Sequence, residues 1–74
     1  MAYATGRVKL RKSRRTGKWI PFGWVTVHDG EEAVNEPVYA PKGIQFDTKE
    51  RAEVYGERMI QEKIKDLKRD GVVE

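Results

Sequence analysis

Basic side chains are concentrated near the start of this 74-residue chain. Seven of its 15 Lys and Arg residues precede position 29, whereas all 12 Asp and Glu residues lie from Asp29 onward. The early basic residues are Arg7, Lys9, Arg11, Lys12, Arg14, Arg15 and Lys18. Ammonium and guanidinium groups neutralise phosphates, so this charge distribution predicts that the N-terminal part of the chain meets a polyanion.

Two aromatic residues, Phe22 and Trp24, follow the basic run. Flat rings stack on nucleobases and so complement cations that neutralise the backbone. These nine side chains, seven basic and two aromatic, therefore predict a nucleic-acid-binding surface. A two-stranded ribbon fits the major groove of DNA, whereas stacking rings favour single strands or RNA, and the residues leave DNA against RNA open.

Residues for covalent or acid–base catalysis are scarce. The chain has one histidine (His28), one serine (Ser13) and no cysteine. The Thr16-Gly17-Lys18 step lacks the upstream glycine of a phosphate-binding loop, because position 12 is Lys. The spacing of His28 and the carboxylates that follow it matches no common metal-ligand pattern. We therefore expect a non-enzymatic protein without cofactor or metal.

The elements that would position these residues begin with two strands, at about 6–13 and 18–28. Basic and apolar residues alternate from Arg7 to Arg11, which is typical of a half-buried strand. A turn centred on Thr16 and Gly17 would join the strands into a hairpin. The segment 31–36 is expected to be an acidic loop. A short edge strand at 37–46 would follow, with a bend at its second proline, Pro41.

The predicted turn also fixes which residues oppose one another. Val8 would face Val25, and Leu10 would face Gly23, on the side covered by a helix. On the other side the expected pairs are Arg7 with Thr26, Lys9 with Trp24 and Arg11 with Phe22. Lys9 and Arg11 would then lie against aromatic rings in cation–π contact. An alternative is a bulge at Pro21 and Gly23, which would turn Phe22 and Trp24 inward.

A helix is predicted at 48–69. Asp47 and Thr48 are both suitable N-caps, Asp47 and Glu50 have the spacing of a capping box, and Gly71 provides a stop. Seven residues fall on one half of the helical wheel, with Val54 alone on the polar side. They are Ala52, Tyr55, Gly56, Met59, Ile60, Ile64 and Leu67.

The expected fold is α+β: one domain, 1–74, with a three-stranded antiparallel sheet packed against one long C-terminal helix, ordered ββ(β)α. The sheet would consist of the N-terminal hairpin and the short edge strand. No apolar run is long enough to span a membrane and no secretory signal is visible, so a cytoplasmic location without membrane partners is expected.

The basic hairpin, the third strand and the helix that starts at Phe46-Asp47-Thr48-Lys49-Glu50-Arg51-Ala52 are similar in outline to the arm-type DNA-binding domains of tyrosine recombinases. That resemblance covers most of the chain as architecture and charge. It implies a three-stranded sheet that enters the major groove of DNA, and it assigns no base-reading residue.

Other functions are compatible with the same residues. The cations could simply keep a small sheet solvated and block edge pairing. Phe22 and Trp24 could form the interface of a homodimer or bind a protein partner. The chain could also be a phage- or operon-type accessory protein that does not bind nucleic acid and whose acidic residues Glu31, Glu32 and Glu36 engage a basic partner. A steep loss of affinity with salt would separate nucleic-acid binding from these alternatives.

Overall fold

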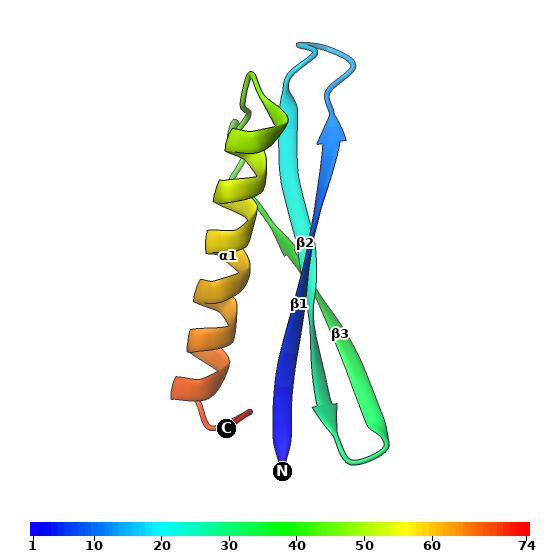
Figure 1. Ribbon diagram of the computed structural model, residues 1–74, viewed down its shortest axis with the longest axis vertical. Coiled ribbons are helices and arrows are strands. Elements are labelled where there is room, and N and C mark those ends of the chain that lie inside the picture. Colours follow the sequence, from blue (N-terminus) through cyan, green and yellow to red (C-terminus); the bar gives the residue numbers. More distant parts are fainter.

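The computed structural model describes residues 1–74 and contains three strands and one helix (Figure 1). They are β1 (Ala2–Lys12), β2 (Trp19–Asp29), β3 (Glu32–Tyr39) and α1 (Lys49–Arg69). The strands form an antiparallel sheet in the order β1-β2-β3, and α1 lies along one face of it. The predicted α+β fold is therefore confirmed. The molecule is elongated, 43 × 21 × 19 Å, because all four elements run along its length.

The turn between β1 and β2 differs from the prediction by one residue. It has four residues, Arg14–Gly17, and is closed by a backbone hydrogen bond of 2.8 Å from Ser13 to Lys18. The hydroxyl of Ser13 also accepts from the amides of Arg15 (3.3 Å) and Thr16 (3.4 Å). The centre of the turn thus lies between Arg15 and Thr16, which the sequence-based placement at Thr16 and Gly17 missed.

This displacement shifts every cross-strand partner by two residues. Arg7 lies opposite Trp24, Lys9 opposite Phe22 and Arg11 opposite Ile20, so the pairs expected from the sequence are wrong. Val8 faces Gly23 and Leu10 faces Pro21. Because the shift is even, each side chain nevertheless stays on the face predicted for it.

Strand β2 is regular through its proline and glycine. The β1–β2 register runs without a bulge from Ala2–Asp29 to Lys12–Trp19. Pro21, Gly23 and Val25 are buried on the helix-facing side, and the alternative with Phe22 and Trp24 turned inward is excluded. β1 begins four residues before the predicted position 6, because Ala2 and Ala4 also pack on the core.

The third strand is also displaced from its prediction. Most of the expected acidic loop lies in β3, because Gly30 (φ 63°) makes a two-residue turn directly after Asp29. Strand β3 ends at Tyr39, so the predicted span 37–46 is wrong. The chain then leaves the sheet, turns at 41–44, and returns at Phe46, whose backbone forms two hydrogen bonds with Trp19 (2.7 and 2.9 Å).

Helix α1 is capped at both ends. The hydroxyl of Thr48 accepts from the Arg51 amide at 3.2 Å, so Thr48 is the N-cap and the capping box expected from Asp47 and Glu50 is absent. At the other end Gly71 takes φ 77°. The amides of Gly71 and Val72 donate to the carbonyls of Lys68 (3.1 Å) and Leu67 (2.9 Å), which is the Schellman arrangement. No part of α1 is both long and apolar enough to cross a lipid bilayer.

The core lies between α1 and the sheet. Val25, Ile60, Leu67 and Val73 form its buried cluster, against which the helix-facing residues of the strands pack. Glycines let the layers approach closely, since a Cβ on Gly6 would fall on Ile60 Cγ2. Beyond the helix, Val73 is buried and the Glu74 amide donates to the Ala2 carbonyl at 3.0 Å. The end of the described chain is thereby fixed to the start of β1.

Candidate nucleic-acid interface

The sheet face that α1 does not cover, here called the open face, carries five of the nine predicted binding residues. Alternation along each strand defines its members. They are Tyr3, Thr5, Arg7, Lys9 and Arg11 of β1, Ile20, Phe22, Trp24, Thr26 and His28 of β2, and Ala33, Asn35, Pro37 and Tyr39 of β3. The three cations therefore form a row along β1, and the aromatic residues lie beside them on β2 and β3.

No carboxylate lies on the open face. The acidic residues of the strands, Asp29, Glu32 and Glu36, all occupy helix-facing positions. Glu36 is partly buried there and pairs with Lys63 of α1 at 3.4 Å. The Oε2 atom of Glu36 forms no hydrogen bond. It nevertheless lies 3.4 Å from the ammonium group of Lys63, so the contact is an ion pair. The positive charge of the open face is consequently not offset within that face.

The cations of the open face also lack ion-pair partners elsewhere. The salt bridges of the molecule involve only Lys18, Lys63 and Arg69 as bases, so Arg7, Lys9 and Arg11 are unpaired. All three are exposed. Unpaired, exposed cations are available to neutralise an external anion without first breaking an internal contact.

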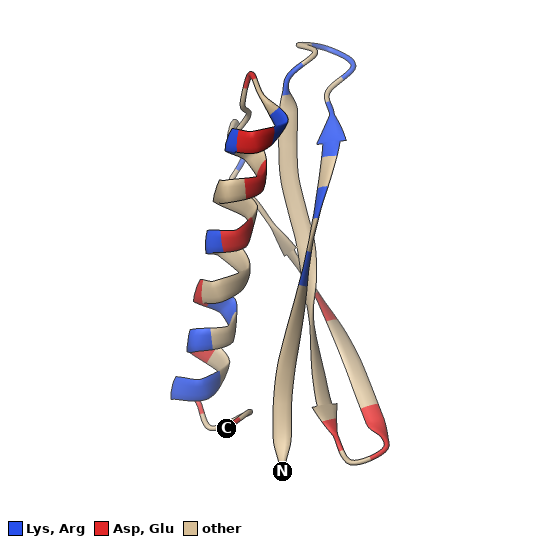
Figure 2. Cartoon of the chain, in the orientation of Figure 1, with Lys and Arg blue, Asp and Glu red and all other residues tan.

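The β1–β2 turn extends the same positive surface. Lys12, Arg14, Arg15 and Lys18 are all exposed and surround the turn. Figure 2 shows basic residues along the half of β1 that leads into the turn and in the turn itself, whereas the β2–β3 hairpin at the opposite end of the sheet is acidic. Only Lys18 is paired, with Asp47 at 3.7 Å. The sheet is therefore electrically polarised along its length, with its positive end at the β1–β2 turn.

The cation–π contacts expected for Lys9 and Arg11 are not formed. Lys12 and Lys49 instead approach the ring of Trp19, at 5.7 and 4.8 Å from its centroid. Trp19 occupies a helix-facing position at the end of β2, where the first turn of α1 reaches it. The two-residue change in register explains the difference for Arg11, which now faces Ile20. No Lys or Arg side chain forms a cation–π contact with the ring of Phe22 or Trp24.

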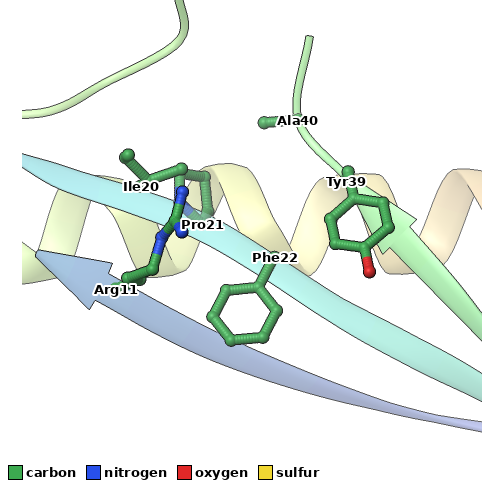
Figure 3. Close-up of a pocket in the computed structure, with 6 residues that line it drawn as sticks. All are labelled: Arg11, Ile20, Pro21, Phe22, Tyr39 and Ala40. Carbon is green, nitrogen blue, oxygen red and sulfur yellow. The ribbon is translucent and has the colours of Figure 1, made fainter. Parts of the chain in front are cut away.

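A hollow of about 290 Å³ opens where β3 leaves the sheet (Figure 3). Its walls include Arg11 of β1, Phe22 of β2 and Tyr39 of β3, with Ile20, Pro21 and Ala40 beside them. Ile20 and Pro21 have no β3 partner, because the β2–β3 ladder ends at the Phe22–Tyr39 pair. The hollow thus forms because β3 ends at Tyr39 and leaves this part of β2 without a neighbouring strand. Tyr39 belongs to this surface and was missed from the sequence, although its alternation with Val38 would have placed it there.

The one serine and the one histidine of the chain have structural partners. The hydroxyl of Ser13 is engaged by the amides of the turn. His28 lies at the neutral end of the open face, where its ring stacks on Tyr3 at 4.6 Å between centroids and its Nε2 is 3.0 Å from the hydroxyl oxygen of Thr5. His28 and the carboxylates of the β2–β3 hairpin do not gather into a group that could hold a metal ion.

Comparison with known proteins gave no relative: no protein-family model matches the chain, and no curated protein or solved structure is significantly similar to it. The functional argument therefore depends on the geometry and charge of the open face.

Proposed function

We propose that this protein is a small non-enzymatic module that binds nucleic acid through its open face and the adjoining β1–β2 turn. One observation carries the proposal: the charged side chains of the open face are all cations, they have no internal partners, and they border the partly exposed rings of Phe22 and Trp24. Phosphates would be neutralised by the cations of β1 and the turn, and the rings of β2 and β3 would contact bases or sugars.

The surface contains nine residues expected from the sequence and one added by the structure. The cations Arg7, Lys9 and Arg11 neutralise phosphates next to the rings of Phe22 and Trp24 in this proposal. The turn contributes Lys12, Arg14, Arg15 and Lys18, and β3 contributes Tyr39. The sheet is a rigid support for these groups, because its register is continuous and α1 packs along its other face.

The test is a titration of labelled duplex DNA, single-stranded DNA and RNA at two salt concentrations. Exchange of Arg7, Lys9 and Arg11 for Gln should weaken binding to all sequences. It should also reduce the slope of log K against log salt by about 2.7 on duplex, or about 2 on single strands, for three lost phosphate contacts. A combined alanine variant of Lys9, Arg11 and Trp24 should bind more weakly still.

The matched control changes the same amount of charge on α1. Arg51, Lys65 and Lys68 are exposed and unpaired and line no hollow with Tyr39, so their exchange for Gln removes three positive charges from the helix and none from the open face. Equal losses in both triple variants would show that only net charge matters and would contradict a defined interface. Absence of binding at low salt would reject the proposal. It would favour instead a protein-interaction role, with Glu31 and Glu32 of the acidic hairpin facing a basic partner.

A further inference from the structure

The hollow beside Tyr39 adjoins a second hollow of different chemistry. The second one measures about 590 Å³ and is lined by Arg11, Lys12, Ser13, Arg14 and Ile20. Arg11 and Ile20 line both hollows, so the two are contiguous across the end of β1. One hollow is mainly apolar and aromatic, and the other is basic and contains no carboxylate. A ligand that spans them must combine a flat apolar part with an anionic part.

We propose that these two hollows together bind one unpaired nucleotide of a single strand. The base would lie against Phe22 and Tyr39, and its phosphate would lie in the basic hollow with Lys12 and Arg14. Arg11, at the junction, can contact both parts, because a guanidinium group stacks on planar rings and also binds phosphate. This inference rests on the proposed function and specifies that the open face selects single strands.

The rings of this site are free to take a base. The only stacked or tilted aromatic pairs in the molecule are Tyr3 with His28 and Phe46 with Tyr55. Phe22 and Tyr39 are direct cross-strand neighbours, and Tyr39 is 72% exposed. A base that enters the hollow would therefore cover aromatic surface now in contact with water. Stacking of this kind tolerates every base, because each base has a π-face.

A paired base fits this arrangement poorly. In a duplex the two faces of each base are covered by its stacked neighbours, and proteins reach it mainly through its edges in the grooves. The hollow, by contrast, is a recess between the end of β3 at Tyr39 and the bridge of Phe46 to Trp19, and the side chains of Phe22 and Tyr39 are part of its lining. Unstacked bases of single strands are the form of nucleic acid that aromatic side chains bind in this way.

The test compares an oligothymidylate of about ten nucleotides, within the usual site size of small single-strand binders, with an abasic oligonucleotide of equal length and charge. Wild-type protein should bind the base-containing strand more tightly than the abasic strand and than duplex DNA of the same length. Tyr39→Ala should lower affinity for the base-containing strand about 5- to 150-fold, the range expected for one lost stacking contact. It should leave abasic binding unchanged. Arg11→Gln should weaken both.

Tyr3→Ala is the matched control, because Tyr3 is also an exposed tyrosine of the open face (57%) but lies at its neutral end. Equal effects of Tyr3→Ala and Tyr39→Ala would overturn the nucleotide site. So would tighter binding to duplex than to the single strand. In each of these cases the proposed function would survive if the Arg7, Lys9 and Arg11 variant still lost binding. Failure of wild-type protein to bind any nucleic acid would reject both proposals.

Discussion

The backbone of α1 at Gly56 lies directly on Val8 of β1. A Cβ atom at position 56 would be 2.6 Å from Val8 Cγ1 and 3.4 Å from Pro21 Cβ. The first of these distances is shorter than real carbon contacts allow, so glycine is required for the observed spacing between helix and sheet. Through this contact α1 supports the strand that carries Arg7 and Lys9.

Gly56→Ala should consequently lower the free energy of unfolding by about 1–3 kcal/mol, as overpacking of a core does. In an unpacked helix the same change would stabilise by about 1 kcal/mol. Urea denaturation of the wild-type protein and of the Gly56→Ala variant measures the change in the free energy of unfolding. Val8→Ala provides the second arm of a double-mutant cycle, since it removes the methyl group that clashes. A stabilised single Gly56→Ala variant would contradict the close contact.

The two valines after the helix should respond differently to truncation. Val73 is buried in the core, whereas Val72 is 47% exposed. Val73→Ala should cost about 1.5–3 kcal/mol, from the lost apolar burial plus the cavity left behind. Val72→Ala, the matched control one residue away, should change the stability by less than about 0.5 kcal/mol. Thermal and urea unfolding of the two variants check this, and similar losses for both would show that Val73 does not pack as described.

Residues 47 and 48 distinguish the observed Thr48 cap from the capping box predicted for Asp47 and Glu50. Thr48→Ala should cost about 1 kcal/mol, because its hydroxyl accepts from the Arg51 amide. For a domain of this size such a loss lowers the melting temperature by about 4–8 °C. Asp47→Ala should cost no more than about 0.5 kcal/mol, since Asp47 forms only an exposed ion pair with Lys18. A larger loss of stability for Asp47→Ala than for Thr48→Ala would contradict the Thr48 cap and favour the capping box of Asp47 and Glu50.

The basic turn is expected to affect binding without affecting the fold. Exchange of Arg14 and Arg15 for Gln should reduce the salt slope by about 1.8 on duplex or about 1.4 on single strands, for two lost contacts. The melting temperature should not change, because the hydrogen bonds of the turn involve the hydroxyls of Ser13 and Thr16 and the backbone, and none involves the side chain of Arg14 or Arg15. Lys65 and Lys68 exchanged for Gln serve as the control. An unchanged slope in the Arg14 and Arg15 variant would exclude the turn from the interface.

The faces of the hairpin could be predicted from the sequence, but its register could not. Alternation of Val8 and Leu10 with basic neighbours is a property of side-chain type, and it specifies which face is buried. The register depends on whether Gly17 takes the middle or the last position of the turn. Hydrogen bonds to the Ser13 hydroxyl favour the last position. These hydrogen bonds join one side chain to two backbone amides, and the alternation of apolar and basic residues gives no information about them.

The third strand was misplaced for a related reason. Its residues are charged and include a proline, a composition typical of a loop. Gly30 at positive φ allows the chain to reverse within two residues, so β3 begins as soon as β2 ends. Pro37 is accommodated because β3 is an edge strand. The predicted strand included Tyr39 but continued to Phe46, so the hollow left by the end of β3 at Tyr39 could not be anticipated, whereas the cations of β1 and the turn could.

The contact between Ala2 and the residues after α1 has a consequence for synthesis of the protein. β1 leaves the ribosome first, but part of the apolar surface that covers it, around Leu67 and Val73, is translated after the rest of the sheet and most of the helix. The strands that pair with one another are translated before α1, so the helix-facing side of β1, β2 and β3 stays exposed to water until α1 is complete. Until then the half-made protein exposes an apolar sheet, and we expect it to be most prone to aggregation at that stage.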